Sequence, residues 1–135
     1  MLTIESDRLS LQMKEDGSGV VLTDRIRGRR WRLDPSHQGY RLDGARDKFL
    51  PLAAGQAARE GDAIAVSYSL PGGEARFAWT LASDHAQVAL QCRSQGVEFV
   101  SLPGAMFPAE GQHEVAIPVY QGLLLRGGGE EWQEW

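Results

Sequence analysis

Cysteine is almost missing from this sequence, which has one, Cys92, among 135 residues. A single thiol cannot form an internal disulfide, so nothing points to a fold that depends on an oxidising compartment. A chain of this length can bury an adequate core without disulfides or a metal. We therefore expect one domain without disulfides, and the reducing cytoplasm as its location.

Long apolar stretches are missing as well. No run approaches the roughly 20 residues that a membrane helix needs. The opening Met1-Leu2-Thr3-Ile4-Glu5 has neither a basic start nor an apolar h-region. We expect no membrane partner and no targeting signal within these residues, although secretion of a longer parent protein stays open.

Positive charge is in deficit, because 14 Lys and Arg stand against 18 Asp and Glu, a formal net charge of -4. Nucleic acids and anionic membranes attract basic surfaces, so neither is an expected partner. The local exception is a group of arginines around Trp31, namely Arg25, Arg27, Arg29, Arg30 and Arg32. Alternating arginines on a hairpin usually form a solvated outer face, and we interpret these in that way.

Sustained helical spacing is hard to find, whereas alternation with period two recurs and indicates strands. Leu9, Leu11 and Met13 alternate with polar residues, and Asp16-Gly17-Ser18-Gly19 then turns the chain into Val20. A second turn at Gly28 is expected to lead into a strand with Trp31 and Leu33 on one face. The first third therefore predicts hairpins.

The middle of the chain predicts a three-stranded meander with turns at Pro71-Gly72-Gly73 and at Ser83-Asp84-His85. One face of each strand is apolar: Ile64, Val66, Tyr68 and Leu70, then Ala75, Phe77, Trp79 and Leu81, then Val88, Leu90 and Cys92. On that face Cys92 is expected to be a buried core thiol rather than a nucleophile. Later strands are expected at 97–102, 115–119 and 123–125. The fold class that we predict is all-β, an antiparallel β-sandwich of two sheets.

The triple glycine Gly127-Gly128-Gly129 is the one linker-like stretch, and it precedes an acidic end that is rich in tryptophan. We expect a β-sandwich domain over residues 1–126 and a segment over 127–135 that leads to a further domain. Trp132 and Trp135 would be poorly placed at an exposed terminus, so we expect them to contact that domain.

No catalytic or metal motif is complete. His37, His85 and His113 lie far apart without metal-ligand spacing, and each is expected at the surface. The acidic residues fall in expected turns, where they usually bond the local backbone; they are Asp16, Asp43, Asp47, Asp62, Asp84 and Glu110. Glu130, Glu131 and Glu134 lack a calcium-loop pattern. We expect no metal, no cofactor and no catalytic pair within the chain.

Aromatic residues are the remaining candidates, because a flat ring covers the apolar face of a sugar while polar neighbours bond its hydroxyls. The contributors to sugar binding or to interdomain packing would be Trp31, Tyr120, Trp132 and Trp135. Phe77 and Trp79 are assigned to the core by their alternation.

Several motifs together carry a resemblance to a known family. They are Leu9-Ser10-Leu11 with its glycine turn, Leu22-Thr23-Asp24 through Gly28 to Trp31, Leu102-Pro103, and Ile117-Pro118 to Gly122-Leu123-Leu124. Their order resembles the amino-terminal β-supersandwich domain, related in fold to galactose mutarotases, that precedes the catalytic barrel in some glycoside hydrolase and related bacterial proteins. The resemblance implies a noncatalytic accessory domain that packs against a barrel carrying the catalytic carboxylates. The histidine and carboxylate contexts of the mutarotases are not matched by His37, His85 or His113.

The function that we expect is that of an amino-terminal accessory domain in a larger carbohydrate-active protein, with the downstream domain as its partner. Three alternatives stay open: a stand-alone carbohydrate-binding module, a small sugar epimerase, and a structural or oligomerising domain. An epimerase would need a histidine and a carboxylate that face one pocket.

Overall fold

A computed structural model describes residues 1–33, 38–45, 48–101, 106–109, 112–117, 123–128 and 131–134. Side chains are described for the same residues up to Ser101 and for Ala109. Every strand pairing in this part of the chain is antiparallel, and no helix occurs in it. It follows that the described residues contain no helix able to cross a membrane. The predicted all-β class is confirmed.

The first sheet has five strands in the order β1-β2-β3-β4-β12. Its strands are β1 (Leu2–Glu5), β2 (Leu9–Met13), β3 (Val21–Asp24), β4 (Arg29–Leu33) and β12 (Met106–Pro108). Glycines at positive φ make both of the turns that the sequence predicts, with Gly17 at 79° before β3 and Gly28 at 67° before β4. The hairpins expected in the first third are confirmed.

The second sheet has four strands in the order β10-β9-β8-β7. They are β7 (Gln56–Glu60), β8 (Ala63–Leu70), β9 (Gly73–Leu81) and β10 (Ala86–Ser94). In the register, Val66 of β8 stands opposite Phe77 of β9, and Leu90 of β10 stands opposite the same phenylalanine. The predicted meander is therefore confirmed strand by strand.

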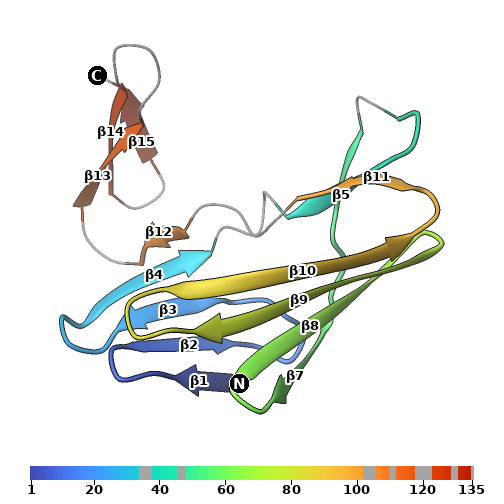
Figure 1. Cartoon of the computed structure of the whole chain (residues 1–135). Helices are drawn as coiled ribbons and strands as arrows, with labels where there is room; N and C mark the ends of the chain where they lie inside the picture. Colours follow the sequence, from blue (N-terminus) through green and yellow to red (C-terminus); the bar gives the residue numbers. More distant parts are fainter. Residues whose placement is uncertain are drawn as a thin grey trace.

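These two sheets share one apolar core, and in Figure 1 the meander lies over strands β1 to β3. Leu11 and Met13 on the first sheet and Ile64 and Val66 on the second are the largest fully buried side chains. Each sheet buries one face of its alternating strands, an arrangement consistent with a β-sandwich. Burial of such side chains stabilises the fold by about 1.5–3 kcal/mol each.

Two smaller sheets are also present. The first has the order β11-β5-β6 and contains β5 (Gly39–Leu42), β6 (Phe49–Pro51) and β11 (Val97–Val100). The second has the order β13-β14-β15 and contains β13 (Gln112–Ile117), β14 (Leu123–Gly128) and β15 (Glu131–Glu134); Figure 1 shows it apart from the two packed sheets, beyond β12. Strands β1, β5, β6, β7, β12 and β15 were not predicted from the sequence, because they are short and their alternation is weak.

The first two residues of the triple glycine, Gly127 and Gly128, lie in strand β14. Gly127 pairs with His113 on one side and with Trp132 on the other. Glycine is permissive in its backbone conformation and leaves the ladder hydrogen bonds intact, so it can occupy such a strand. A further domain after residue 126 stays a prediction.

The expectation that Cys92 is a core thiol is wrong, because its side chain is exposed. Cys92 shares a strand face with Val88 and Leu90, which pack partly buried against the core. Its strand, β10, lies at the edge of the sheet and extends past β2 and β3 at this end, so the opposing sheet does not cover the last residues (Figure 1). The alternation predicted correctly which way the side chain of Cys92 points. It did not predict how far the opposing sheet extends over β10.

The turn after β2 is hydrogen-bonded to the second sheet at one edge of the two packed sheets. Backbone amides of Gly55 and Ala57 donate to the carbonyls of Asp16 and Glu15, at 2.9 and 2.8 Å. Gly17 itself is buried, and a Cβ at its position would lie 2.5 Å from Cγ1 of Val66 and 2.8 Å from the hydroxyl of Tyr68. The glycine thus supplies both a left-handed backbone and a close approach between the sheets.

Replacing Gly17 by alanine should destabilise the protein more than the same change at Gly28. Both glycines have positive φ, which costs an alanine about 1–2 kcal/mol. A Cβ at Gly28 meets nothing within 4 Å, whereas at Gly17 overpacking adds about 1–3 kcal/mol. Urea denaturation of Gly17→Ala and Gly28→Ala measures the difference. Equal losses of stability in the two variants would show that the turn at Gly17 is not closely packed against the second sheet.

Candidate functional site

Three turns meet at one end of the packed sheets, at the left in Figure 1. The turn between β1 and β2 carries Arg8, and the turn between β3 and β4 carries Arg27. The turn between β9 and β10 carries Asp84 and His85. All four residues line one pocket of about 420 Å³.

The pocket is the open end of the space between the two sheets. Besides the turn residues, its lining includes Leu9, Leu22, Asp24 and Trp31. Leu9 is paired with Asp24, and Leu22 is paired with Trp31, so all four belong to the core-facing side of the first sheet. Trp31 is half-buried there. The inner face of the sheet therefore continues to the pocket, where the cover of the second sheet ends.

Asp24 is a buried carboxylate that organises the turn between β3 and β4. Its Oδ1 accepts hydrogen bonds from the backbone amides of Ile26 at 2.9 Å and Arg27 at 3.1 Å. These bonds, with that of Arg27 the larger influence, hold the pKa of Asp24 below its usual value. The carboxylate thereby fixes the turn that places Arg27 at the pocket.

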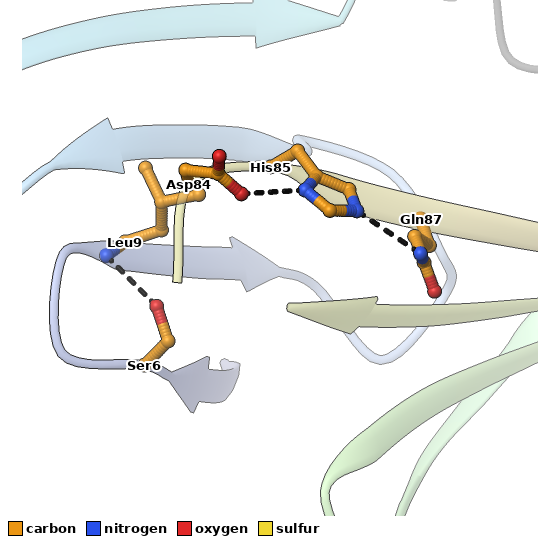
Figure 2. Close-up of polar contacts among 5 residues, drawn as sticks. All are labelled: Ser6, Leu9, Asp84, His85 and Gln87. Carbon is orange, nitrogen blue, oxygen red and sulfur yellow. Dashed lines mark hydrogen bonds and ion pairs between the residues drawn. The ribbon is translucent and has the colours of Figure 1, made fainter. Parts of the chain in front are cut away.

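His85 lies between two polar partners at the start of β10, as Figure 2 shows. Its Nδ1 is 2.7 Å from Oδ1 of Asp84, and its Nε2 is 3.0 Å from Nε2 of Gln87. In the neutral tautomer with its proton on Nδ1, His85 would donate to Asp84 and accept at Nε2 from the amide of Gln87. Hydrogen bonding to His85 and its nearby charge lower the pKa of Asp84. Both side chains stay exposed, at 54% for His85 and 68% for Asp84.

Arg8 brings a positive charge to the same pocket. Part of its guanidinium group has no hydrogen-bond partner among the described residues. Its Nε is buried and has no hydrogen-bond acceptor among the described residues. Its charge contributes to the lowered pKa values of both Asp24 and Asp84, so it acts on the two carboxylates from a distance. A buried donor without a partner is unfavourable for the folded state.

The backbone around Arg8 is tied to the neighbouring turn. Ser6 Oγ accepts a hydrogen bond from the amide of Leu9 at 3.0 Å, which closes the turn between β1 and β2 (Figure 2). The amide of Arg25 donates to the carbonyl of Arg8 at 2.7 Å, and Nη1 of Arg25 donates to the carbonyl of Ser6 at 2.8 Å. Two turns that are distant in sequence thus form one polar rim.

The residues singled out from the sequence have different outcomes. Trp31 lies in the pocket. Tyr120 and Trp135 are outside the described residues, and for Trp132 only the backbone, in β15, is described. The interpretation of the arginine cluster as a solvated face is supported, because Arg25, Arg27, Arg29, Arg30 and Arg32 are all exposed.

The histidines were expected at the surface. That is correct for His85, whereas His37 and the side chain of His113 are outside the described part. The acidic residues were expected in turns, and Asp16, Asp43, Asp62 and Asp84 do lie in turns or bends; Asp47, Glu110 and Glu130 fall outside the described residues. Groups of three or more possible metal ligands are not found among the residues that the structure describes.

Arg8 and Asp24 are pocket residues that the sequence reading missed as site residues. Asp24 had a local signal, because an aspartate four residues before a turn glycine is typical of a carboxylate that caps the turn. Arg8 had none, since its place at the pocket depends on strands that pair across the sheet.

Comparison of the chain with protein-family models, with curated proteins and with solved structures found no match in any of the three. The fold and the pocket are therefore interpreted from their own geometry.

Removing the charge of Asp24 should change how stability depends on pH. Its folded pKa is lowered, so ionised Asp24 stabilises the fold above its unfolded value of about 3.9, and this contribution is lost as the pH falls through the lowered pKa. We expect Asp24→Asn to be less stable at neutral pH and to lose less stability between about pH 5 and about pH 2.

Urea denaturation over that pH range is the measurement. Asp62→Asn is the matched control, because Asp62 is exposed in the turn between β7 and β8. An Asp24→Asn curve parallel to that of the unmodified protein would contradict the role assigned to Asp24.

Proposed function

We propose that this chain is a noncatalytic accessory β-sandwich domain of a larger carbohydrate-active protein, and that it contributes a sugar-binding pocket at Trp31. The observation that carries the proposal is the half-buried Trp31 beside Arg8, Asp24 and His85 in one pocket. The resemblance to the amino-terminal domains of glycoside hydrolase-like proteins supports the same proposed function.

The chemistry of the pocket suits a sugar. Its volume of about 420 Å³ falls within the roughly 300–1,000 Å³ of small-molecule sites. A pyranose ring has an apolar face that packs on an aromatic ring, and hydroxyls that need donors and acceptors at the edge. Trp31 with Leu9 and Leu22 offers the apolar surface, while the three turns offer the polar groups.

The position of the pocket at one end of the sandwich is compatible with an accessory role, because this end stays open to solvent or to a neighbouring domain. A downstream catalytic domain that packs at this end would share the pocket with its own cleft. In that arrangement the sandwich shapes substrate binding and the catalytic carboxylates belong to the other domain.

Replacing Trp31 by alanine should strongly weaken saccharide binding. Loss of the ring removes the stacking surface, so we expect the dissociation constant to rise by at least about tenfold. Trp31→Phe keeps a smaller flat ring and should retain weak binding. Isothermal titration against mono- and oligosaccharides is the measurement.

Phe99→Ala is the control for the Trp31 variants, because Phe99 is 49% exposed on β11 and does not line the pocket. Far-ultraviolet circular dichroism establishes that each variant folds. A Trp31→Ala chain that folds and binds the saccharide as tightly as the unmodified chain would overturn the proposal.

A second candidate function, sugar epimerisation, is favoured by one observation: a histidine and two carboxylates line a common pocket. Nε2 of His85 would be the proton acceptor once a ligand hydroxyl replaces Gln87, and Asp84 would orient the ring through Nδ1. The exposure of both side chains leaves this arrangement less preorganised than catalysis usually requires.

Anomeric exchange measured by nuclear magnetic resonance separates the two functions. An accessory domain should leave the exchange rates of the common aldohexoses at their uncatalysed values. Acceleration by the unmodified chain that falls by about 10²-fold or more in His85→Gln would establish the epimerase instead. Gln91→Ala, on the exposed part of β10, is the control substitution.

A further inference from the structure

We propose that the pocket selects acidic saccharides, with Arg8 and Arg27 binding the carboxylate of a uronic acid unit while Trp31 packs against its ring. This inference rests on the proposed sugar-binding function and names the class of sugar. It assigns a role to two arginines that the fold itself does not require.

The carboxylates of the pocket already have partners. Asp24 accepts two backbone amides of its own turn, and Asp84 is paired with His85. Asp7 is exposed in the same turn as Arg8 but does not line the pocket. The two carboxylates that line the pocket are therefore engaged in local structure.

The guanidinium groups are in the opposite situation. Nε of Arg8 is buried with no acceptor in the described part of the chain. Arg27 is exposed at the rim, and its backbone amide, rather than its side chain, makes the hydrogen bond to Asp24. The guanidiniums approach the pocket from two different turns, and a planar carboxylate is the acceptor that guanidinium groups bind best.

Charge selects among the possible ligands. The chain as a whole is acidic, with a formal net charge of -4, so a long polyanion such as nucleic acid meets net repulsion away from this end. A saccharide with one carboxylate per ring can place that group at the arginines and its apolar face on Trp31. A neutral sugar brings no negative charge to the two guanidinium groups.

The test is isothermal titration of the whole chain against matched trimers of glucose, galactose and mannose, each beside the trimer of its uronic acid. We expect at least one uronic acid trimer to bind about tenfold or more tightly than its neutral counterpart. We expect that preference to shrink between about 0.05 M and about 0.5 M NaCl, because salt screens the charges. Arg27→Gln and Arg8→Gln should each reduce the preference.

Arg93→Gln is the matched control, since Arg93 is exposed near the far end of β10 and does not line the pocket. Arg27 is exposed in a turn, so Arg27→Gln tests the inference even if Arg8→Gln fails to fold.

The possible failures are distinguishable. If no trimer of either kind binds, the proposed sugar-binding function is wrong, and this inference is wrong with it. If neutral and acidic trimers bind equally, or if Arg27→Gln keeps the full preference, only the choice of acidic saccharides is wrong. Equally tight binding of a single-stranded oligonucleotide of the same charge would show unselective attraction of anions and would also overturn the inference.

Discussion

The face-to-face burial of two antiparallel sheets is the constraint on which the rest of this structure depends. Side chains alternate along a strand, so each sheet has one face for the core, and Leu11 and Met13 meet Ile64 and Val66 there. Close contact along one edge requires Gly17, whose position leaves no room for a Cβ. At the end of the sandwich the same inner face continues to Trp31 and is no longer covered, and this is where the pocket lies.

The turns at that end convert an uncovered apolar face into a polar pocket. A buried carboxylate without partners would be costly, but Asp24 is bonded to two backbone amides of its turn. Arg25 ties the turn between β3 and β4 to the turn between β1 and β2 through the carbonyls of Ser6 and Arg8. Stability and site geometry are thus coupled, because the bonds that close the turns also place Arg8 and Arg27.

The long alternating strands could be predicted from the sequence, and the site could be predicted only in part. Residues 63–94 carry strong alternation and tight turns, so their meander was recognised, whereas strands of three residues such as β6 and β12 give too little pattern. Trp31 was recognised as a candidate from its chemistry alone. Its companions Arg8 and Asp24 come from other strands, and Cys92 was misplaced because alternation does not report where the opposing sheet ends.

The pocket has equal numbers of arginine and aspartate residues, yet its charges are not equivalent. Elsewhere in the structure charged side chains form direct ion pairs, as Arg76 of β9 and Glu60 of β7 do. Here the aspartates bond to the backbone and to His85, while Arg8 influences them from a distance and has a buried donor with no acceptor in the part of the chain that the structure describes. Folding alone gains nothing from that arrangement, because an unsatisfied buried donor is unfavourable. Two arginines beside the half-buried Trp31 are the reason that we propose a binding site at this end of the sandwich.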